Sequence, residues 1–259
     1  MFNLDLATLP LIAGNFVFPL FRIMGMLMVM PMIGSRTVPK KVRLSFAIAI
    51  TLIIAPTIEV NTPLALDVGT WLEGAKQTAI GIMMGLSLYI MIEVFTVGAQ
   101  LISSQMGLGF ANITDPNNGT SVVVIAQFYN LLVMLLFLAT NGHLFMLDIL
   151  ASSFDLMPIG SHDFNENIVW EIILKGSWMF SSALLLSLPA VTALLIVNFA
   201  FGIMTKAAPQ INIFSIGFPF TMVMGLFITW ASMEGFYGFF TKVNDEMISF
   251  ITMLSTGGI

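Results

Sequence analysis

The stretch Gly176–Thr205 decides the fold; it reads GSWMFSSALLLSLPAVTALLIVNFAFGIMT and contains no Asp, Glu, Lys or Arg. A helix that crosses the hydrocarbon core of a bilayer, ~30 Å thick, needs about 20 predominantly apolar residues. Three further runs lack these charged residues: Val94–Thr114, Pro116–Leu147 and Ile213–Met233. The whole chain is 58% hydrophobic and 9% charged, too few charges to cover a water-soluble surface. The sequence therefore predicts an all-α membrane protein.

Turn-forming residues divide the chain into about six long, partly kinked hydrophobic helices, with shorter amphipathic helices after the fourth and the sixth. The six predicted regions are Leu6–Met32, Val42–Ile58, Trp71–Gln105, Ser121–Thr140, Ile168–Met204 and Ile213–Phe240. Pro19 and Pro189 lie inside the first and fifth regions. Because proline removes a backbone donor, we expect the freed carbonyls to be satisfied by neighbouring protein.

Basic residues gather on one side of a six-span topology. Five of the nine fall there: Arg36, Lys40, Lys41, Arg43 and Lys206. The positive-inside rule makes this side cytoplasmic and places both termini outside. Met1–Pro10 contains no Lys or Arg, so it lacks the positively charged start of a cleavable signal peptide, and we expect the first helix to be retained.

Several classes of function find no support in the residues. The chain has no Cys, no G-x-x-x-x-G-K-[ST] phosphate loop and no G-x-S-x-G elbow. His143 and Asp148 have no carboxylate ligand set around them, and His162-Asp163 lies in a polar loop. The net charge of −5 comes without a basic stripe that would neutralise phosphates. We expect no enzyme activity, cofactor, metal or nucleic-acid partner.

Two charges interrupt apolar helices and need partners. Arg22 lies deep in the first region and Glu93 interrupts the third. An intramembrane charge costs at least ~2.5 kcal/mol, so we expect Arg22 to pair with Glu93 or with Asp148, or to face water. One interpretation is an ion or proton relay; the favoured one is a structural ion pair or a contact in subunit assembly.

The third region has two distinguishable faces. Small residues at Thr78, Gly81 and Gly85 are typical of close helix packing. Polar residues recur at helical spacing on another face, at Tyr89, Glu93, Thr96 and Gln100, and continue to Ser103 and Ser104. A polar stripe on a membrane helix usually faces protein or an aqueous cavity.

This polar face leads into a glycine- and asparagine-rich segment, about 105–119, that should not continue the helix. One interpretation is a pore plug; the other is an ordinary surface connection, for which Met106, Leu108 and Phe110 are unusually apolar. The candidate plug residues are Gln105, Met106, Gly107, Leu108, Gly109, Phe110, Ala111, Asn112, Asp115, Pro116, Asn117 and Asn118.

Three places together resemble the FliR family, also called the SctT family in injectisomes, and the likeness runs along nearly the whole chain. The first place is Phe21–Gly25 with Pro31–Gly34 and Val38–Arg43; the second is Gly98–Gly107 with Asp115-Pro116; the third is Ala208–Pro219, which includes Pro209, Asn212 and Phe214 in an inter-helix turn. Phe220-Thr221 departs from the family, which often has a basic step there.

The resemblance implies a non-enzymatic subunit of the flagellar or type III protein export gate, in the bacterial inner membrane at the flagellar basal body. It implies FliP-type, FliQ-type and FlhB-type partners, exported polypeptides and membrane lipid. It also implies a FliP-like part, 1–167, that carries the plug, followed by a FliQ-like hairpin and amphipathic tail, 168–259. The alternative that the residues leave open is a secondary carrier of a small solute, with a midplane site around Arg22 and Glu93 and broken helices near Pro19 and Pro189.

Overall fold

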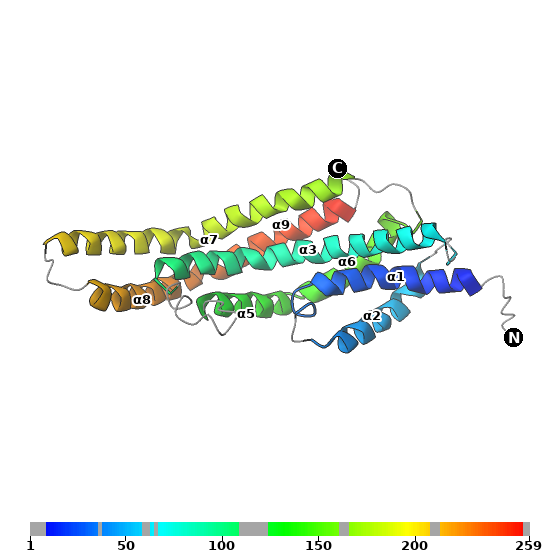
Figure 1. Ribbon diagram of the computed structural model, residues 1–259, viewed down its shortest axis with the longest axis horizontal. Coiled ribbons are helices and arrows are strands. Elements are labelled where there is room, and N and C mark those ends of the chain that lie inside the picture. The colour runs from blue at the N-terminus through cyan, green and yellow to red at the C-terminus, as the bar shows by residue number, and fades with distance from the viewer. Residues whose placement is uncertain are drawn as a thin grey trace. The chain divides into compact units, whose positions relative to one another are not determined.

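A computed structural model describes residues 9–35, 38–58, 63–64, 67–108, 124–160, 166–207 and 213–255, and every regular element in these ranges is helical (Figure 1). The long helices are α1 Leu9–Val29, α2 Lys40–Ile54, α3 Val68–Gln105, α5 Val124–Ala139, α6 Gly142–Leu156, α7 Glu166–Ala207, α8 Ile213–Ser232 and α9 Phe236–Ser255, with short 3₁₀ turns at Ala55–Thr57 and Met233–Gly235. The prediction of an all-α fold is confirmed.

The described helices test part of the six-span expectation. In the part of the chain that the structure describes, three helices are long and apolar enough to cross a bilayer: Pro10–Val29, Val68–Gln105 and Ile168–Ala207. A fourth span is counted if α5 and α6, which meet at an angle of 67°, form one broken span. The 15 residues of α2 extend about 22 Å, which is less than the ~30 Å core.

The chain divides into two compact units, and each is assembled from separate segments. The first unit contains residues 1–90, 137–175 and 247–259; the second contains 91–136 and 176–246. Helices α3, α7 and α9 each contribute residues to both units. The family resemblance implies a different division, into a FliP-like part, 1–167, and a FliQ-like part, 168–259. That division is based on likeness to other proteins and not on contacts within the chain, and it stays a prediction.

In the first unit, α1 and the beginning of α3 run parallel and pack with their backbones close together. A Cβ at Gly81 would collide with the carbonyl oxygen of Arg22, and one at Gly85 would lie 2.6 Å from the carbonyl oxygen of Met26. Gly25 on α1 similarly faces Thr78 on α3. The prediction that Thr78, Gly81 and Gly85 form a close-packing face is confirmed, because only small residues permit this approach.

The turn between α1 and α2 is also tightly constrained. Met32 has a φ of 74°, a left-handed conformation that non-glycine residues rarely adopt. Arg43 on α2 holds the turn, since its Nε donates to the carbonyl oxygen of Ile33 and its Nη2 to that of Ser35, both at 3.1 Å. One of the basic residues of this loop is therefore used to fix its backbone.

The second unit has an aromatic core around Phe95 on α3. Its ring centroid lies 5.4 Å from that of Phe236 and 6.1 Å from that of Phe240, both on α9. Tyr129 on α5 packs edge-on against Phe236, with 5.2 Å between centroids. Such tilted and edge-to-face contacts suit the charge distribution of aromatic rings. They join α3, α5 and α9 within this unit.

The sixth predicted region does not continue to Phe240 as one helix. Helix α8 ends at Ser232, the 3₁₀ turn Met233–Gly235 follows, and α9 begins at Phe236. Glu234 and Gly235, both exposed, interrupt the apolar run at this point. The apolar helix therefore ends eight residues before Phe240, where the sequence analysis placed its end.

Candidate functional site: a buried arginine and the end of helix α3

Arg22, on α1, is fully buried and its guanidinium is surrounded by hydrogen-bond acceptors. Nε donates to Oε1 of Gln77 at 2.7 Å. Nη1 donates to the carbonyl oxygen of Ser153 at 2.7 Å and to its Oγ at 3.0 Å. Nη2 donates to the carbonyl oxygen of Met157 at 2.7 Å. Three helices of the first unit, α1, α3 and α6, therefore meet at this side chain.

The acceptors on α6 lie at its C-terminal end, where the last carbonyl groups of a helix have no partner within the helix. Helix α6 ends at Leu156; the carbonyl oxygen of Ser153 also accepts the N–H of Met157 at 3.0 Å, and Met157, just past the helix end, offers its own carbonyl oxygen. The negative end of the helix dipole favours a cation at the same place. The guanidinium also lies 4.2 Å from the centroid of the Phe154 ring, a distance suited to a cation–π contact. Arg22 acts as a cationic cap supplied by another helix.

Glu73 supplies a negative charge one hydrogen bond further away. Gln77 accepts from Arg22 and donates through Nε2 to Oε1 of Glu73 at 2.6 Å. The same carboxylate oxygen accepts the backbone N–H of Gly160 at 3.0 Å, and Gly160 has a φ of 85°. Through Gln77, the charge on Arg22 is thus connected to a carboxylate that also fixes the turn after α6.

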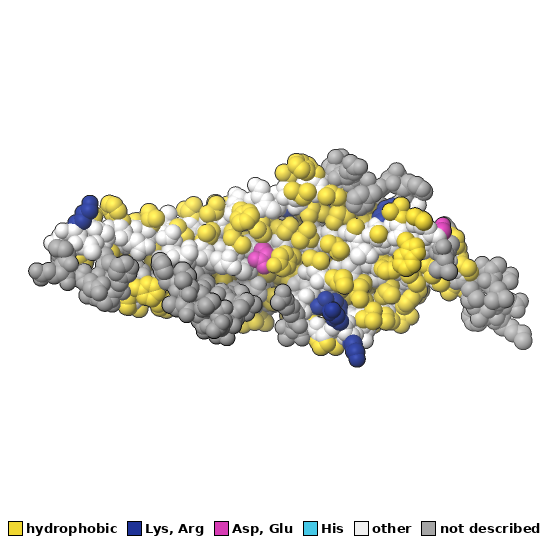
Figure 2. Space-filling view, in the orientation of Figure 1, with side chains coloured by type: hydrophobic (Ala, Val, Ile, Leu, Met, Phe, Trp, Pro, Cys, Tyr) yellow, Lys and Arg dark blue, Asp and Glu magenta, His cyan; other side chains and the backbone are white. Residues whose placement is uncertain are grey.

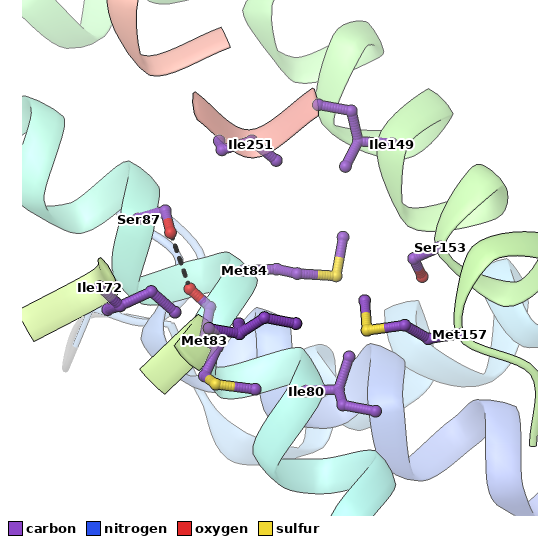
Figure 3. A pocket seen from close by; sticks show the side chains of 10 residues that line it. Ile80, Met83, Met84, Ser87, Ile149, Ser153, Met157, Ile172 and Ile251 are labelled. Atoms are coloured by element: carbon purple, nitrogen blue, oxygen red, sulfur yellow. Dashed lines mark hydrogen bonds between the residues drawn. The ribbon is translucent and has the colours of Figure 1, made fainter. Parts of the chain in front are cut away.

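A small apolar cavity adjoins the acceptors of Arg22 (Figure 3). Its volume is about 20 Å³, and its walls include Met84, Ile149, Ser153 and Met157. Buried water needs two to four polar partners, and these walls are almost entirely apolar, so the cavity offers water no stable site. Without Arg22, the carbonyl oxygen of Met157 would face an apolar surface instead of a donor.

The partners expected for Arg22 from the sequence are wrong. Within the described ranges, the hydrogen bonds of Arg22 go to Gln77, Ser153 and Met157. Asp148 is exposed on α6 and is not one of these partners, and Glu93, half-buried, belongs to the other unit. The physical reason is that backbone and hydroxyl oxygens at the C-terminal end of α6, together with the uncharged amide of Gln77, already supply acceptors for the guanidinium.

The residues of the predicted polar face of α3 differ in their exposure, since some are buried and others are exposed. Thr96 is buried and its Oγ1 accepts from Nδ2 of Asn130 on α5 at 3.1 Å. Ser103 is buried too and donates to the carbonyl oxygen of Ala99. Tyr89 and Gln100 are exposed. Only some of these polar residues therefore face protein within their own unit.

The end of α3 shows where the predicted plug segment is attached. The N–H of Gly107 donates to the carbonyl oxygen of Ser104, and the N–H of Leu108 to that of Ser103, both at 3.1 Å. Gly107 has a φ of 80°. This pair of bonds around a left-handed glycine is the Schellman motif, a standard helix end. Gln105 is the last residue of α3.

Two side chains anchor this helix end to the hairpin of α7 and α8. Met106 is fully buried, and its side chain occupies the space that a Cβ at Gly225 would fill. Nδ2 of Asn198 on α7 donates to the carbonyl oxygen of Gln105 at 3.4 Å. Gly107 also lies against the ring of Phe218 on α8. The first residues of the predicted plug are thus held in place by the second unit.

The remaining predicted site residues are partly outside the described residues. The predicted site residues that lie outside the described residues are Gly109, Phe110, Ala111, Asn112, Asp115, Pro116, Asn117, Asn118, Pro209 and Asn212. Phe214 lies in the first turn of α8, and its side chain is not described. Close to this turn, the rings of Phe201 and Phe220 stack edge-on at 5.2 Å and join α7 to α8.

Sequence reasoning missed Glu73, Gln77, Ser153 and Gly225. The spacing of Glu73 and Gln77, four residues apart on one helix face, was a readable signal for a hydrogen-bonded pair. Ser153, Met157 and Gly225 offered no such signal, because their roles depend on which helices meet. Among the described residues, no group of three or more His, Cys, Asp and Glu is placed to hold a metal ion.

Sequence comparisons give this arrangement a context. Residues 13–247 match the family described as Bacterial export proteins, family 1. The chain is 34% identical over 248 residues to the flagellar biosynthetic protein FliR of Pectobacterium carotovorum subsp. carotovorum, covering 94% of this chain and 95% of the relative. It is 36% identical over 219 residues to FliR of Escherichia coli strain K12, covering 84% of each chain. FliR of Bacillus subtilis strain 168 is 30% identical over 222 residues.

Proposed function

We propose, starting from the fact that this chain belongs to the FliR family of bacterial export proteins, that it helps to form and close the export channel in the bacterial inner membrane. Membership is supported along almost the whole chain, and it makes the protein a component of the flagellar export apparatus. The finer role is a structural and gating subunit of the export gate at the basal body. It has no catalytic step of its own.

The observation that carries the gating role is the anchored end of α3. Met106 and Gly107 fix the helix end against α8, so the segment that follows starts from a defined place. That segment, Gly109–Asn118, contains three asparagines, one glycine, one proline and a single charged residue, Asp115. A segment attached at a rigid point can block a channel and leave it without moving the helix that carries it. The segment from Gly109 onward is the plug.

The assembly with FliP-type and FliQ-type subunits is supported by the surface of α7. In the most apolar stretch of α3, 67% of the residues are buried, whereas in that of α7 only 17% are. Leu188, Ile196 and Phe199 on α7 are more than half exposed. Apolar helix faces of this kind contact lipid or other membrane helices. FlhB-type protein is the further partner, and exported polypeptides are the cargo.

Arg22 and Glu93 serve assembly rather than proton conduction in this proposal. The donors of Arg22 are engaged by protein acceptors on α3 and α6, which suits a structural role. Glu93 is half-buried on α3 and stays a candidate for a contact with a neighbouring subunit. The Pro209–Phe214 turn is the candidate hairpin end that faces the cytoplasmic partners.

One observation favours the alternative, a carrier of a small solute. In the second unit, a cavity of about 500 Å³ is lined by Pro189 on α7 and by Glu234 and Gly235 at the break between α8 and α9. Interrupted helices around a cavity are typical of carriers. The predicted carrier site at Arg22 is less suited, because its guanidinium already makes four hydrogen bonds to the protein.

The test of the gating role replaces Gly109–Asn118 by a Gly/Ser linker of equal length, which leaves Met106, Gly107 and Leu108 unchanged. We expect the assembled gate to form in normal yield and to leak ions or small solutes more than the native gate. The matched control is Val68→Ser, an 84% exposed position at the start of α3, which should assemble and leak like the native gate. Normal assembly with unchanged leakage would remove the plug from the proposal.

A further inference from the structure

Helix α2 has an exposed apolar face that its contacts with α1 leave uncovered. Its buried side chains are Ala47, Ile50, Thr51 and Ile54. On other faces, Val42 is 56% exposed, Phe46 42% and Ile53 75%. Val42, Phe46, Ala49 and Ile53 follow one another at helical spacing, so they form a continuous stripe, which we call the α2 stripe.

Positive charge lies at one end of the α2 stripe and is not balanced within this part of the chain. Lys40 and Lys41 are exposed at the start of α2, and among the described residues neither ammonium group has a hydrogen-bond or ion-pair partner. Arg43, in contrast, is engaged with the turn before the helix. The sequence from Gly34 to Ile58 contains no Asp or Glu. Figure 2 shows basic side chains next to a hydrophobic surface in this region.

The dimensions fit a single leaflet of a bilayer. From Val42 to Ile53 the α2 stripe rises about 17 Å at 1.5 Å per residue. Half of the ~30 Å hydrocarbon core is ~15 Å. Lysine side chains at the end of such a stripe extend toward the headgroups while their methylene stems stay on apolar surface. The hydroxyl groups of Ser45 and Thr51 donate to backbone carbonyls of α2 itself, so they need no water.

We propose that α2 binds an anionic phospholipid, with the headgroup phosphate at Lys40 and Lys41 and an acyl chain along the α2 stripe. An anionic headgroup complements the two lysines, whereas a zwitterionic lipid leaves their charge unbalanced. Each basic residue near an anionic membrane surface contributes about 1 kcal/mol of attraction, which is a preference of about five-fold. This site is independent of the role in export, since it requires only that the chain lies in a membrane.

The test uses the absence of cysteine in the chain to place one fluorophore. Phe46→Cys is labelled in the assembly purified from its own cells and reconstituted in nanodiscs, and the cysteine-free parent chain supplies the background. Quenching is measured with spin-labelled phosphatidylglycerol and with spin-labelled phosphatidylcholine at equal mole fraction. We expect several-fold more efficient quenching by the anionic lipid. Adding Lys40→Gln and Lys41→Gln removes the preference but leaves the quenching by phosphatidylcholine.

The matched control is Leu131→Cys, an exposed position (59%) on α5, in the uncharged run Pro116–Leu147. There the two lipids are expected to quench equally. Equal quenching by both lipids at Phe46→Cys, or a preference that survives the lysine substitutions, would overturn the proposal. So would the absence of quenching by either lipid, because it would mean that a protein surface covers α2.

Discussion

Arg22 is a charged residue inside an apolar helix. The cost of burying its charge is offset by hydrogen bonds to uncharged acceptors rather than by a direct ion pair. A charge at this depth costs at least ~2.5 kcal/mol. Hydrogen bonds to a charged group contribute roughly 1.5–3 kcal/mol each, and Arg22 makes four of them. The planar guanidinium suits this task because its donors point in fixed directions. Glu73 balances the charge through Gln77.

The first prediction concerns this side chain. Arg22→Met keeps much of the volume but removes the donors, so the carbonyl oxygen of Met157 loses its partner. We expect a loss of stability on the order of 3–5 kcal/mol, as when one member of a buried charged network is removed. Arg22→Lys keeps the charge without the fork of donors and should be intermediate. Thermal denaturation of the purified chain in detergent is the measurement.

The control for this prediction is Lys206→Met, which removes a positive charge from an exposed position at the end of α7. It should leave the denaturation midpoint within the error of the native value. If Arg22→Met denatured at the native midpoint, the network around Arg22 would not be a stabilising feature of the first unit.

At the same scale, two left-handed residues differ in how far they are predictable. Asn141 has a φ of 58° and precedes Gly142, and an Asn-Gly pair is a turn signal that can be read from the sequence alone. Met32 has a φ of 74°, and nothing about methionine indicates it. Met32 lies in the turn that Arg43, on the next helix, holds through hydrogen bonds to Ile33 and Ser35, so its conformation depends on a contact between two elements.

At the scale of elements, the short distance between the backbones of α1 and α3 depends on glycines at their contact. The small-residue face of α3 was predictable, since Thr78, Gly81 and Gly85 recur at helical spacing. Which helix packs there was not predictable from that spacing alone. In the structure, the helix that packs on this face is α1, whose backbone at Arg22 lies directly against Gly81. The same approach brings Arg22 within reach of Gln77.

The second prediction compares two glycines. Gly81→Ala should destabilise the chain by about 1–3 kcal/mol, because the added methyl group collides with backbone that has no alternative position. Gly176→Ala meets nothing within 4 Å and should be neutral or stabilising by up to about 1 kcal/mol, as expected from helix propensity. Denaturation midpoints of both variants give the sign. Equal effects would contradict the close contact of α1 and α3.

Helix ends are a second feature of elements that the sequence indicated incompletely. The segment from about Gln105 was expected not to continue the helix, and α3 does end at Gln105. The sequence did not indicate that Met106, Gly107 and Leu108 form a Schellman end rather than an irregular loop. Gly107 alone is an ambiguous signal, because glycine marks both helix ends and loops. The burial of Met106 against Gly225 distinguishes the two, and it depends on α8.

At the scale of the whole molecule, the apolar runs were sufficient for the fold class and for most helices. The number of spans stays a prediction, except that α2, at 15 residues, is too short to cross the ~30 Å core as a straight helix. The resemblance that rests on Phe21–Gly25, Gly98–Gly107 and Ala208–Pro219 was confirmed as membership in the FliR family. The predicted partners of Arg22 were wrong, because its hydrogen-bond partners depend on which helices pack together rather than on opposite charge.

The exposed apolar surface of α7 makes a single free chain an incomplete molecule in this account. Native mass spectrometry of the detergent-extracted, tagged protein from its own cells tests this directly, because it reports partners and copy number together. The account predicts one copy of the 28.3 kDa chain in a reproducible complex with several smaller membrane proteins. A lone chain or a homo-oligomer, under conditions that preserve known membrane complexes, would contradict the export-gate subunit and favour the carrier.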